Sequence, residues 1–224
     1  MGLGGAVPLA LDVACGTGQS AVALTAVAEQ VVGIDISRSM LANVEPNERI
    51  RLAQARAEAI PIRSSAVSIV STGLAFHWFD RHLFLQEAWR VLEDDGFLMI
   101  YNNGFSGRMK ENPAFQDWSH GAYQDRFPAP SRDRRPFTAD EAAASGFASV
   151  GEERYENEVR FTPETLVAYL MTQTNVVAAI DEGRERLGSA QAWLLEQVRP
   201  YFTTPDATFI FVTRAWYARK IAAG

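Results

Sequence analysis

The chain has 224 residues, 47% of them hydrophobic, which is enough to bury one sizeable core. Its 21 basic and 27 acidic side chains give a net charge of −6, which argues against nucleic acid or an anionic membrane as a partner and favours a small-molecule ligand. No stretch approaches the roughly 20 apolar residues of a membrane span, the start lacks the basic region of a signal peptide, and Cys15 has no second cysteine to pair with, so we expect a cytoplasmic protein.

Short apolar runs alternate with segments of helical spacing over the first hundred residues. This alternation is typical of βαβ units and a mostly parallel sheet. The expected strands are 9–13, 30–34, 50–53, 67–71 and 97–101. Helical spacing follows the first of them in 18–29, the second in 37–44, and the fourth after Asp80, where we expect Asp95-Gly96 to end the helix.

The character of the chain changes at residues 104–146, which are rich in Pro, Gly, Arg and aromatic residues. A segment this long between sheet elements is typically an insertion that covers a binding site. After it we expect a strand at 149–155, helices around 163–180 and 187–199, and a last strand at 208–213. The sequence thus predicts one domain, 1–224, with a cofactor-binding half at 1–103, an insertion or lid at 104–146, and the C-terminal part of the sheet at 147–224.

The stretch LDVACGTGQSA, residues 11–21, places two glycines directly after the first expected strand. Its spacing Gly16-x-Gly18-x-x-Ala21 is that of a turn whose backbone amides bind the pyrophosphate of a dinucleotide. Asp12 argues against a pyrophosphate, because a like charge nearby is costly where the effective dielectric is low. An ammonium group would be attracted instead, and S-adenosylmethionine offers one, together with a carboxylate for the helix N-terminus.

Two further positions indicate an adenosine ligand. Asp35 ends the second apolar run, 17 residues after Gly18, where an acidic side chain can accept hydrogen bonds from both ribose hydroxyls. After the third strand, Ala57 and Glu58 precede a turn proline, and an acidic side chain or backbone group there can pair with the adenine amine. The ribose contact is common to NAD and S-adenosylmethionine and does not choose between them.

Five segments in order carry a family resemblance: LDVACGTGQ, VVGIDIS, ARAEAIPI, VSIVSTGLAFHWFD and AWRVLEDDGFLMIY. Over residues 9–103 they resemble the successive motifs of class I S-adenosylmethionine-dependent methyltransferases. HWFD and the later FTPETLVAYLMTQTNV are similar to the small-molecule branch that includes trans-aconitate and ubiquinone-biosynthesis methyltransferase-like proteins.

The resemblance implies an α/β, Rossmann-like fold. Its seven-stranded, mostly parallel sheet has the last strand antiparallel, helices on both faces and a helical insertion after strand five. The resemblance also implies S-adenosylmethionine as cofactor, contacted by Asp12, Ala14, Gly16, Gly18, Gln19, Asp35, Ile36, Ala57, Glu58, Gly73 and Ala75.

The sequence departs from the family pattern in two places. Family members usually carry a helical segment ahead of the first strand that closes over the cofactor, whereas only residues 1–8 precede that strand here. We therefore expect a more open pocket, or one closed by a partner chain in an oligomer. Ser68 stands where the family commonly has an acid, and we expect only a structural adjustment there.

Methyl transfer from a sulfonium is an in-line displacement that depends on positioning the two reactants and excluding water. A general base is needed only if the acceptor loses a proton, since a carboxylate acceptor is already ionised. His77, at the carboxyl end of the fourth strand, is the candidate base, although it can also serve packing within the FHWF turn. His82 and His120 fit no ligand spacing with Cys15, so we expect no metal.

Candidate acceptor contacts lie in the same turn, at the end of strand five and in the insertion. They are Trp78, Tyr101, Asn102, Arg108 and Trp118. Each has a plainer alternative: the aromatic side chains can pack, the strand-end residues can cap a loop, and the charged ones can form a solvated face. Residues 104–137 carry six basic against four acidic side chains, a local excess that would suit an anionic acceptor.

Together these features predict an S-adenosylmethionine-dependent methyltransferase acting on a small molecule, with a carboxylate or hydroxyl oxygen as the first acceptor to consider. The Asn/Asp-Pro-Pro-aromatic motif of nucleic-acid amino methylation does not follow strand four, where TGLAFHW stands. The alternatives are a carbon or nitrogen methyltransferase of a secondary metabolite, an NAD-dependent oxidoreductase, and a cofactor-binding protein with little activity. Asp12 and the lack of a Tyr-x-x-x-Lys pair disfavour the oxidoreductase.

Overall fold

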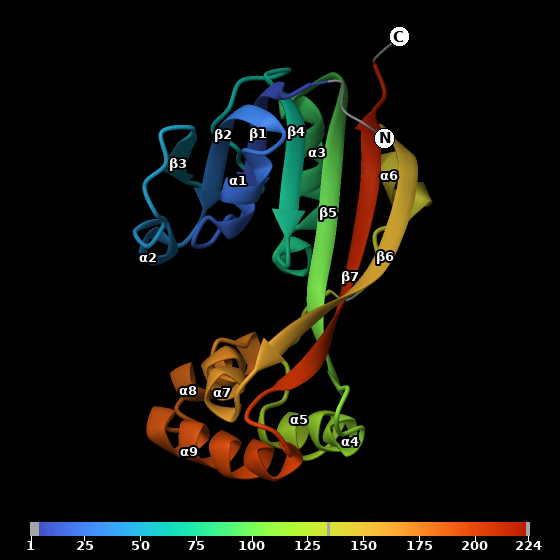
Figure 1. Ribbon diagram of the computed structural model, residues 1–224. Helices are drawn as coiled ribbons and strands as arrows, with labels where there is room; N and C mark the ends of the chain where they lie inside the picture. Colours follow the sequence, from blue (N-terminus) through green and yellow to red (C-terminus); the bar gives the residue numbers. More distant parts are fainter. Residues whose placement is uncertain (1–4, 134, 223–224) are drawn as a thin grey trace. The chain divides into compact units, whose positions relative to one another are not determined.

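The computed structural model of the chain describes residues 5–133 and 135–222 (Figure 1). The strands are β1 (Val7–Val13), β2 (Ala28–Asp35), β3 (Ile50–Gln54), β4 (Val67–Gly73), β5 (Leu92–Met109), β6 (Phe147–Phe161) and β7 (Ala207–Lys220). The α-helices are α1 (Gln19–Leu24), α2 (Arg38–Leu41), α3 (Arg81–Val91), α4 (Ala114–His120), α5 (Ala122–Arg126), α6 (Ala139–Ala144), α7 (Pro163–Met171), α8 (Thr174–Asp181) and α9 (Leu187–Val198). Two 3-10 turns, η1 (Phe76–Trp78) and η2 (Arg199–Tyr201), complete the described elements.

The chain divides into two compact units. Unit 1 consists of Met1–Asn102, Asp133–Arg154 and Arg214–Gly224, and unit 2 of Asn103–Arg132 and Tyr155–Thr213. The strands β5, β6 and β7 contribute residues to both units. The expected insertion at 104–146 is therefore divided between them, with its first part in unit 2 and its last part in unit 1.

The strands form one sheet in the order β3-β2-β1-β4-β5-β7-β6. β1 pairs in parallel with β2 and β4, β2 with β3, and β4 with β5. β7 runs antiparallel to β5: its last residue, Lys220, donates to the carbonyl of Leu92 at the start of β5, and Thr208 near its beginning accepts a bond from the Lys110 N–H just after β5 ends. A mostly parallel sheet with an antiparallel last strand confirms the fold that the sequence predicted.

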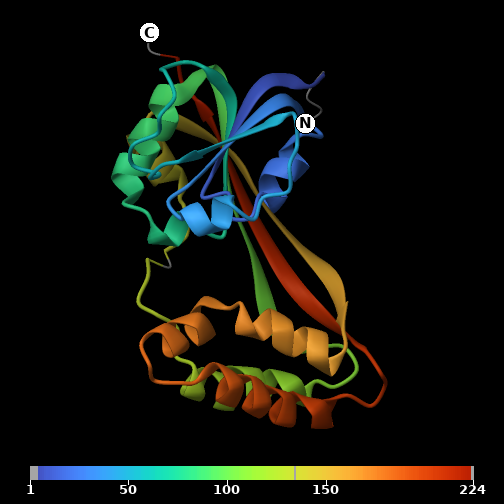
Figure 2. The same ribbon diagram turned by 90° about the vertical axis from the view of Figure 1, so that its left-hand side faces the viewer.

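The two faces of the sheet in unit 1 bury different side chains because successive strand residues point to opposite faces. Leu11 of β1 packs in one cluster with Phe84 of α3, whereas its neighbour Ala10 packs in another cluster with Leu24 of α1. Figure 2 shows α1 (blue) and α3 (green) on opposite sides of the strands. This layering exposes the carboxyl ends of β1, β2 and β4 at one edge, where the loops that follow them can form a site.

Unit 2 has a core of its own, built largely from aromatic side chains. Phe115 of α4, Phe127 after α5 and Phe209 of β7 are completely buried in it. The apolar faces of α7, α8 and α9 close this core, with Leu170 and Leu194 also fully buried. The first part of the expected insertion, 104–132, therefore contributes α4, α5 and the end of β5 to a second packed unit.

Three expected helix boundaries were wrong. The helix expected at 18–29 ends at Leu24, because Ala28 already pairs with Val7 as β2 begins. The helix expected around 163–180 is interrupted between α7 and α8, where the hydroxyl of Thr172 bonds back to a helix carbonyl and Gln173 has an extended backbone. Both differences arise from local or tertiary contacts that helical spacing does not record.

The third wrong boundary is the end of α3. The helix ends at Val91 rather than at Asp95-Gly96, since Leu92 pairs with Val67 of β4 and starts β5. The pairing of these strands shifts register between Val67 and Ile69, and Asp95 has a left-handed backbone with φ 62°. The pair Asp95-Gly96 therefore marks an irregularity inside a strand and not the end of a helix.

Candidate functional site

The loop after β1 turns sharply through three residues with positive φ. These are Ala14 at 59°, Gly16 at 55° and Gly18 at 83°. A Cβ on Gly16 would have no heavy atom of the described residues within 4 Å, whereas a Cβ on Gly18 would lie 2.5 Å from Cγ1 of Val44. Gly18 is therefore required by protein packing, and Gly16 is the glycine that leaves open space for a ligand.

Asp35, at the end of β2, holds the glycine loop in place. Its Oδ2 accepts the Gly16 N–H at 2.9 Å, and its Oδ1 accepts the Ser37 N–H at 2.8 Å. A carboxylate has about four lone-pair sites, so Asp35 can accept further bonds from a pair of ribose hydroxyls. The structure thus joins the two predicted cofactor residues, Gly16 and Asp35, by a direct hydrogen bond.

Asp12 lies beneath the loop and is completely buried. Its Oδ2 accepts a 2.5 Å bond from the Ser20 hydroxyl of α1, but its Oδ1 has no hydrogen-bond partner among the described residues. Ser71, which faces Asp12 from β4, likewise has a hydroxyl that lacks a partner within the described part of the chain. Because a buried carboxylate with one unpartnered oxygen is costly, this position suits a cationic group bound over the loop.

Burial also changes the acidity of Asp12. It raises the pKa of this carboxyl to about 7, and the nearby Asp35 acts in the same direction, while the bond from Ser20 opposes the shift. Asp12 therefore changes its charge near neutral pH. Its attraction for a cation should be strongest in the ionised form, above this pKa.

Four other predicted cofactor residues surround these groups. Gln19 is exposed at the first position of α1, and Ile36, directly after Asp35, is 60% exposed. Ala57 is buried. The carboxylate of Glu58 accepts the Asp80 N–H at 3.1 Å, so it bonds to the residue that begins α3. A contact with an adenine amine at this turn would have to share Glu58 or use the backbone.

Predicted residues also meet at the carboxyl ends of β4 and β5. Gly73 pairs with Tyr101, and a Cβ on Gly73 would lie 2.4 Å from Cζ and 2.5 Å from Oη of Tyr101. The tyrosine ring therefore lies across the end of β4, in space that a side chain would occupy. Leu74 donates its N–H to the Tyr101 carbonyl at 2.9 Å, and Asn102 follows at the same edge.

The 3-10 turn η1 follows this edge. Ala75 is buried at its start, and the rings of His77 and Trp78 are in tilted contact, with centroids 4.9 Å apart. Trp78 is 46% exposed, and the His77 carbonyl accepts the Asp133 N–H at 3.3 Å. The candidate base and the candidate aromatic contact thus lie in one turn of unit 1, directly after β4.

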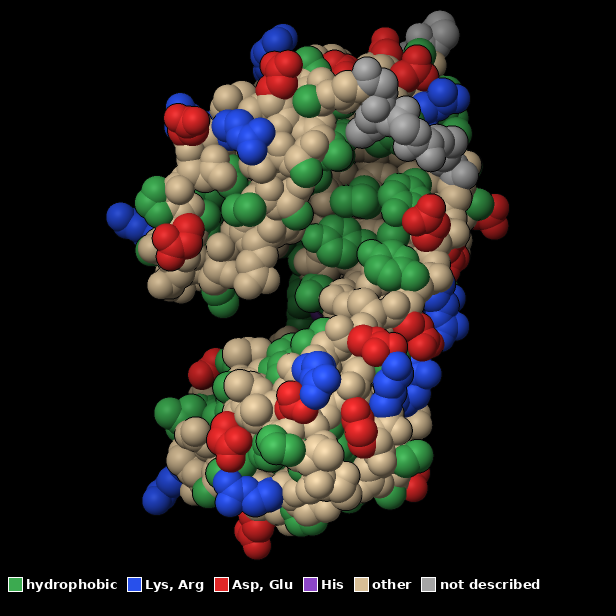
Figure 3. Space-filling view, in the orientation of Figure 1, with side chains coloured by type: hydrophobic (Ala, Val, Ile, Leu, Met, Phe, Trp, Pro, Cys, Tyr) green, Lys and Arg blue, Asp and Glu red, His purple; other side chains and the backbone are tan. Residues whose placement is uncertain are grey.

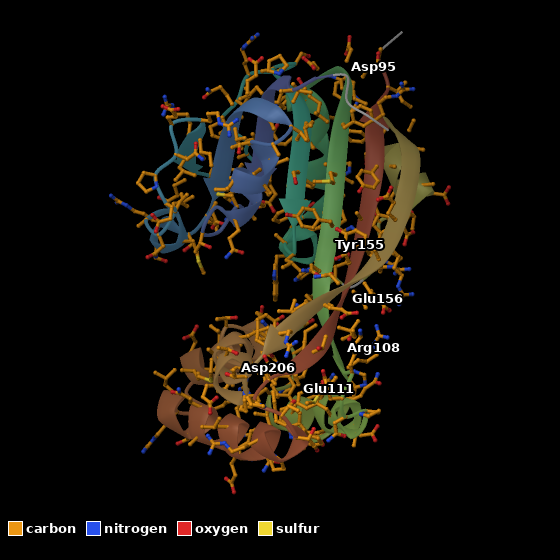
Figure 4. The ribbon with its side chains drawn as sticks, viewed as in Figure 1. Asp95, Arg108, Glu111, Tyr155, Glu156 and Asp206 are labelled. Atoms are coloured by element: carbon orange, nitrogen blue, oxygen red, sulfur yellow. The ribbon has the colours of Figure 1, made fainter. Side chains whose placement is uncertain are left out.

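Arg108 and Trp118, the remaining candidate acceptor contacts, belong to unit 2. Arg108 pairs with Glu156 at 2.6 Å (Figure 4), and Trp118 is buried in the aromatic core against Phe115 and Tyr123. Carboxylates also pair with other basic side chains of the predicted insertion, namely Lys110, Arg126 and Arg135. On the face shown in Figure 3, Lys and Arg side chains lie among Asp and Glu side chains and form no separate basic patch.

The described part of the chain holds neither a cluster of metal ligands nor a membrane-spanning helix. Within 5–133 and 135–222, no three His, Cys, Asp or Glu side chains are grouped as a metal ion would require. No helix in the same part of the chain is long and apolar enough to cross a membrane.

Sequence reasoning missed Ser20 and Ser71, and for Leu74 it anticipated only that this segment, with Gly73 and Ala75, contacts the cofactor. The contact of Ser20 could have been predicted, because a hydroxyl in the first turn after a glycine loop lies close to the preceding strand. Ser71 meets Asp12 only through the register of β1 with β4, and the left-handed backbone of Leu74 depends on how the chain leaves β4. No local pattern in the sequence records either of these.

The sheet order and the glycine loop after β1 define a Rossmann-like methyltransferase fold. A structure from Anaeromyxobacter dehalogenans described as a type II methyltransferase shares it with a TM-score of 0.72, at 22% identity over 96% of this chain and 89% of that one. A geranyl diphosphate methyltransferase, solved in complex with GPP and sinefungin, gives a TM-score of 0.54 at 14% identity over 98% of this chain and 75% of that one.

Residues 11–100 match the family described as "Methyltransferase domain". A Dictyostelium discoideum protein described as a methyltransferase is 30% identical over 106 residues, 47% of this chain and 40% of that one. A Mycobacterium tuberculosis protein described as an S-adenosylmethionine-dependent methyltransferase is 30% identical over 92 residues, 40% of this chain and 34% of that one. Residues 11–100 are thus similar to a methyltransferase domain, and the chain spans less than half the length of these relatives.

The first prediction concerns Asp35. Asp35→Asn should weaken binding of S-adenosylhomocysteine about tenfold to 100-fold in calorimetric titration, because a hydrogen bond to a charged group is worth about 1.5–3 kcal/mol. Glu29→Gln, an exposed acid on the same strand, is the matched control and should bind normally. Equal affinity of Asp35→Asn and wild type would exclude Asp35 from the cofactor site.

The second prediction concerns the buried acid Asp12. Its folded-state pKa, about 7, is above the ordinary value of 3.8, so its contribution to stability is fully present below pH 3.8 and is lost as pH rises through 7. The melting temperature of Asp12→Asn should therefore rise relative to that of wild type as the pH is raised from 5 to 8. The affinity of Asp12→Asn for S-adenosylmethionine should be lower than that of wild type. A melting-temperature difference that does not change with pH would contradict the assignment.

Proposed function

We propose that this protein transfers a methyl group from S-adenosylmethionine to an oxygen of a small-molecule acceptor. The observation that carries the proposal is the position of Tyr101, whose hydroxyl lies over Gly73 at the end of β4. A phenolic hydroxyl there can donate a hydrogen bond to an acceptor oxygen and orient it for in-line attack. His77 follows four residues after Gly73 and can remove the proton of a hydroxyl acceptor.

The residues around the glycine loop have complementary roles in this proposal. S-adenosylmethionine supplies an electrophilic methyl group on its sulfonium sulfur. Asp35 accepts hydrogen bonds from the ribose, and Asp12 attracts the cationic end of the cofactor from beneath the loop. Gly16 leaves room for the cofactor, and Trp78 can stabilise a sulfonium by a cation–π contact worth about 0.5–2 kcal/mol.

The class of acceptor is proposed from the sequence phrases HWFD and FTPETLVAYLMTQTNV, which are similar to trans-aconitate and ubiquinone-biosynthesis methyltransferases. These suggest carboxylic acids and phenols as the acceptors to test. The proposal does not require an anionic acceptor, because Arg108 and three other basic side chains of the predicted insertion are already paired with carboxylates. A carbon or nitrogen acceptor is the alternative that an acceptor screen would reveal.

The proton-transfer role of His77 gives a prediction that depends on the acceptor. His77→Ala should lower kcat about 100-fold or more with a phenol, because a general base typically contributes that much. It should leave kcat with a carboxylic acid nearly unchanged. His82→Ala, which alters an exposed histidine five residues away, is the control. Equal effects of His77→Ala on both kinds of acceptor would leave His77 only a packing role.

Two substitutions test the position of Tyr101. Tyr101→Phe removes the hydroxyl and keeps the ring, whereas Gly73→Ala keeps the hydroxyl and forces the ring from its place, since the new Cβ would lie 2.4 Å from it. Both should lower kcat/KM about tenfold or more, and cofactor affinity measured by titration should change little with Tyr101→Phe. Full activity of both variants, or binding of NAD in place of S-adenosylhomocysteine by wild type, would overturn the proposed function.

A further inference from the structure

Leu74, directly after β4, has a backbone that disfavours its own side chain. Its φ is +58°, a left-handed conformation that residues other than Gly, Asn and Asp rarely adopt. The other described non-glycine residues with positive φ are Ala14, Ser65 and Asp95, so Leu74 is the one large apolar side chain among them. A glycine at this position would fold with less strain.

Protein packing does not account for the leucine. The backbone conformation is fixed by the turn from β4 into η1, in which the Leu74 N–H bonds to the Tyr101 carbonyl at 2.9 Å. A glycine would make the same bond. The side chain itself is 53% exposed and belongs to none of the buried clusters of unit 1. Something outside the protein core must explain why a strained, exposed leucine is present.

The position of Leu74 in the sheet indicates that a bound ligand is the reason for the leucine. β4 lies between β1 and β5, and the strand order reverses between β1 and β4. Open α/β sheets bind their ligands at such a reversal, beyond the carboxyl ends of the strands. Leu74 is the first residue beyond β4 at this point, one residue from Gly73 and the ring of Tyr101. Trp78, 46% exposed, follows in η1 and adds a second apolar surface.

We propose that Leu74 is a specificity-determining residue that contacts an apolar carbon skeleton on the methyl acceptor. This inference rests on the proposed methyl transfer and narrows its substrate class. The acceptor oxygen is carried by an aliphatic or aromatic body, as in an alkylphenol or a medium-chain carboxylic acid. A compact polyanion such as malonate would gain nothing from the leucine. The strain at Leu74 is retained because the side chain serves the acceptor and not the fold.

Two variants separate the effect of backbone strain from the effect of side-chain contact with the acceptor. Leu74→Gly removes both the side chain and the strain, whereas Leu74→Ala removes most of the side chain and keeps the strain. In protein saturated with S-adenosylhomocysteine, both should weaken calorimetric binding of 4-propylphenol and octanoic acid about tenfold, as expected for a lost leucine contact. The affinity for S-adenosylhomocysteine should change less than twofold. Leu74→Gly should also melt at a higher temperature than wild type.

Two controls isolate the effect. Ser65→Gly relieves a similar backbone conformation elsewhere in unit 1, so it should raise the melting temperature without changing acceptor binding. Leu83→Ala removes an exposed leucine from α3, 44% exposed, and should change neither acceptor nor cofactor affinity.

Unchanged binding of 4-propylphenol and octanoic acid by both Leu74 variants would overturn the inference, and so would a lower melting temperature of Leu74→Gly, which would show that the side chain supports the fold. The proposed function is tested separately, by measuring methyl transfer by the wild-type protein. Acceptor binding that depends on Leu74, without turnover of any acceptor, would refute methyl transfer while keeping the specificity role.

Discussion

The hydrogen bond between the Asp35 carboxylate and the Gly16 amide connects the two strands from which the rest of the site is built. Asp35 ends β2, Gly16 follows β1, and the second oxygen of the same carboxylate fixes the turn at Ser37. The Cys15 N–H also bonds to the Ile34 carbonyl, and the Asp35 carboxylate extends this link to the strand end that we propose contacts the ribose. The Asp35 carboxylate thus helps to fix the shape of the loop and supplies the hydrogen-bond acceptors beside it. For this reason an acidic residue at the end of the second strand is a strong indicator of the site in the sequence.

Two residues in unit 1 lower the stability of the free protein, and both lie where a ligand is expected. Asp12 is a buried acid with one unpartnered oxygen, and Leu74 is a leucine in a left-handed backbone. Several helix starts, by contrast, follow local rules: Asp80, Thr138 and Thr162 each accept a hydrogen bond from the first turn of their helix. Departures from such rules concentrate at functional sites, where ligand binding offsets the cost. Asp12 lies in β1 beneath the glycine loop, and Leu74 lies directly after the neighbouring strand β4.

The parallel half of the sheet could be predicted from the sequence because its strands are short, buried and separated by turn residues. The full length of the long strands could not, although parts of them were expected at 97–101, 149–155 and 208–213. β6 reads FASVGEERYENEVRF, whose charged residues give no apolar alternation, and β5 contains Asp95-Gly96 and two further glycines that interrupt any strand pattern. In the candidate site, spacing was sufficient to select Gly16 and Asp35, which the structure joins by a hydrogen bond. It could not show that Glu58 bonds to the backbone of Asp80, 22 residues away, or that Tyr101 lies over Gly73, because both contacts depend on tertiary packing.

The sharing of β5, β6 and β7 between the two units has a consequence for how this protein can change over evolution or be re-engineered. Unit 2 is made of two separate stretches: Asn103–Arg132, which enters along β5, and Tyr155–Thr213, which enters along β6 and leaves along β7. It cannot be exchanged as one cassette by a single recombination event. A functional replacement would need both stretches to be exchanged together with strand register preserved, so variation in this unit should accumulate by point substitution rather than by shuffling of modules.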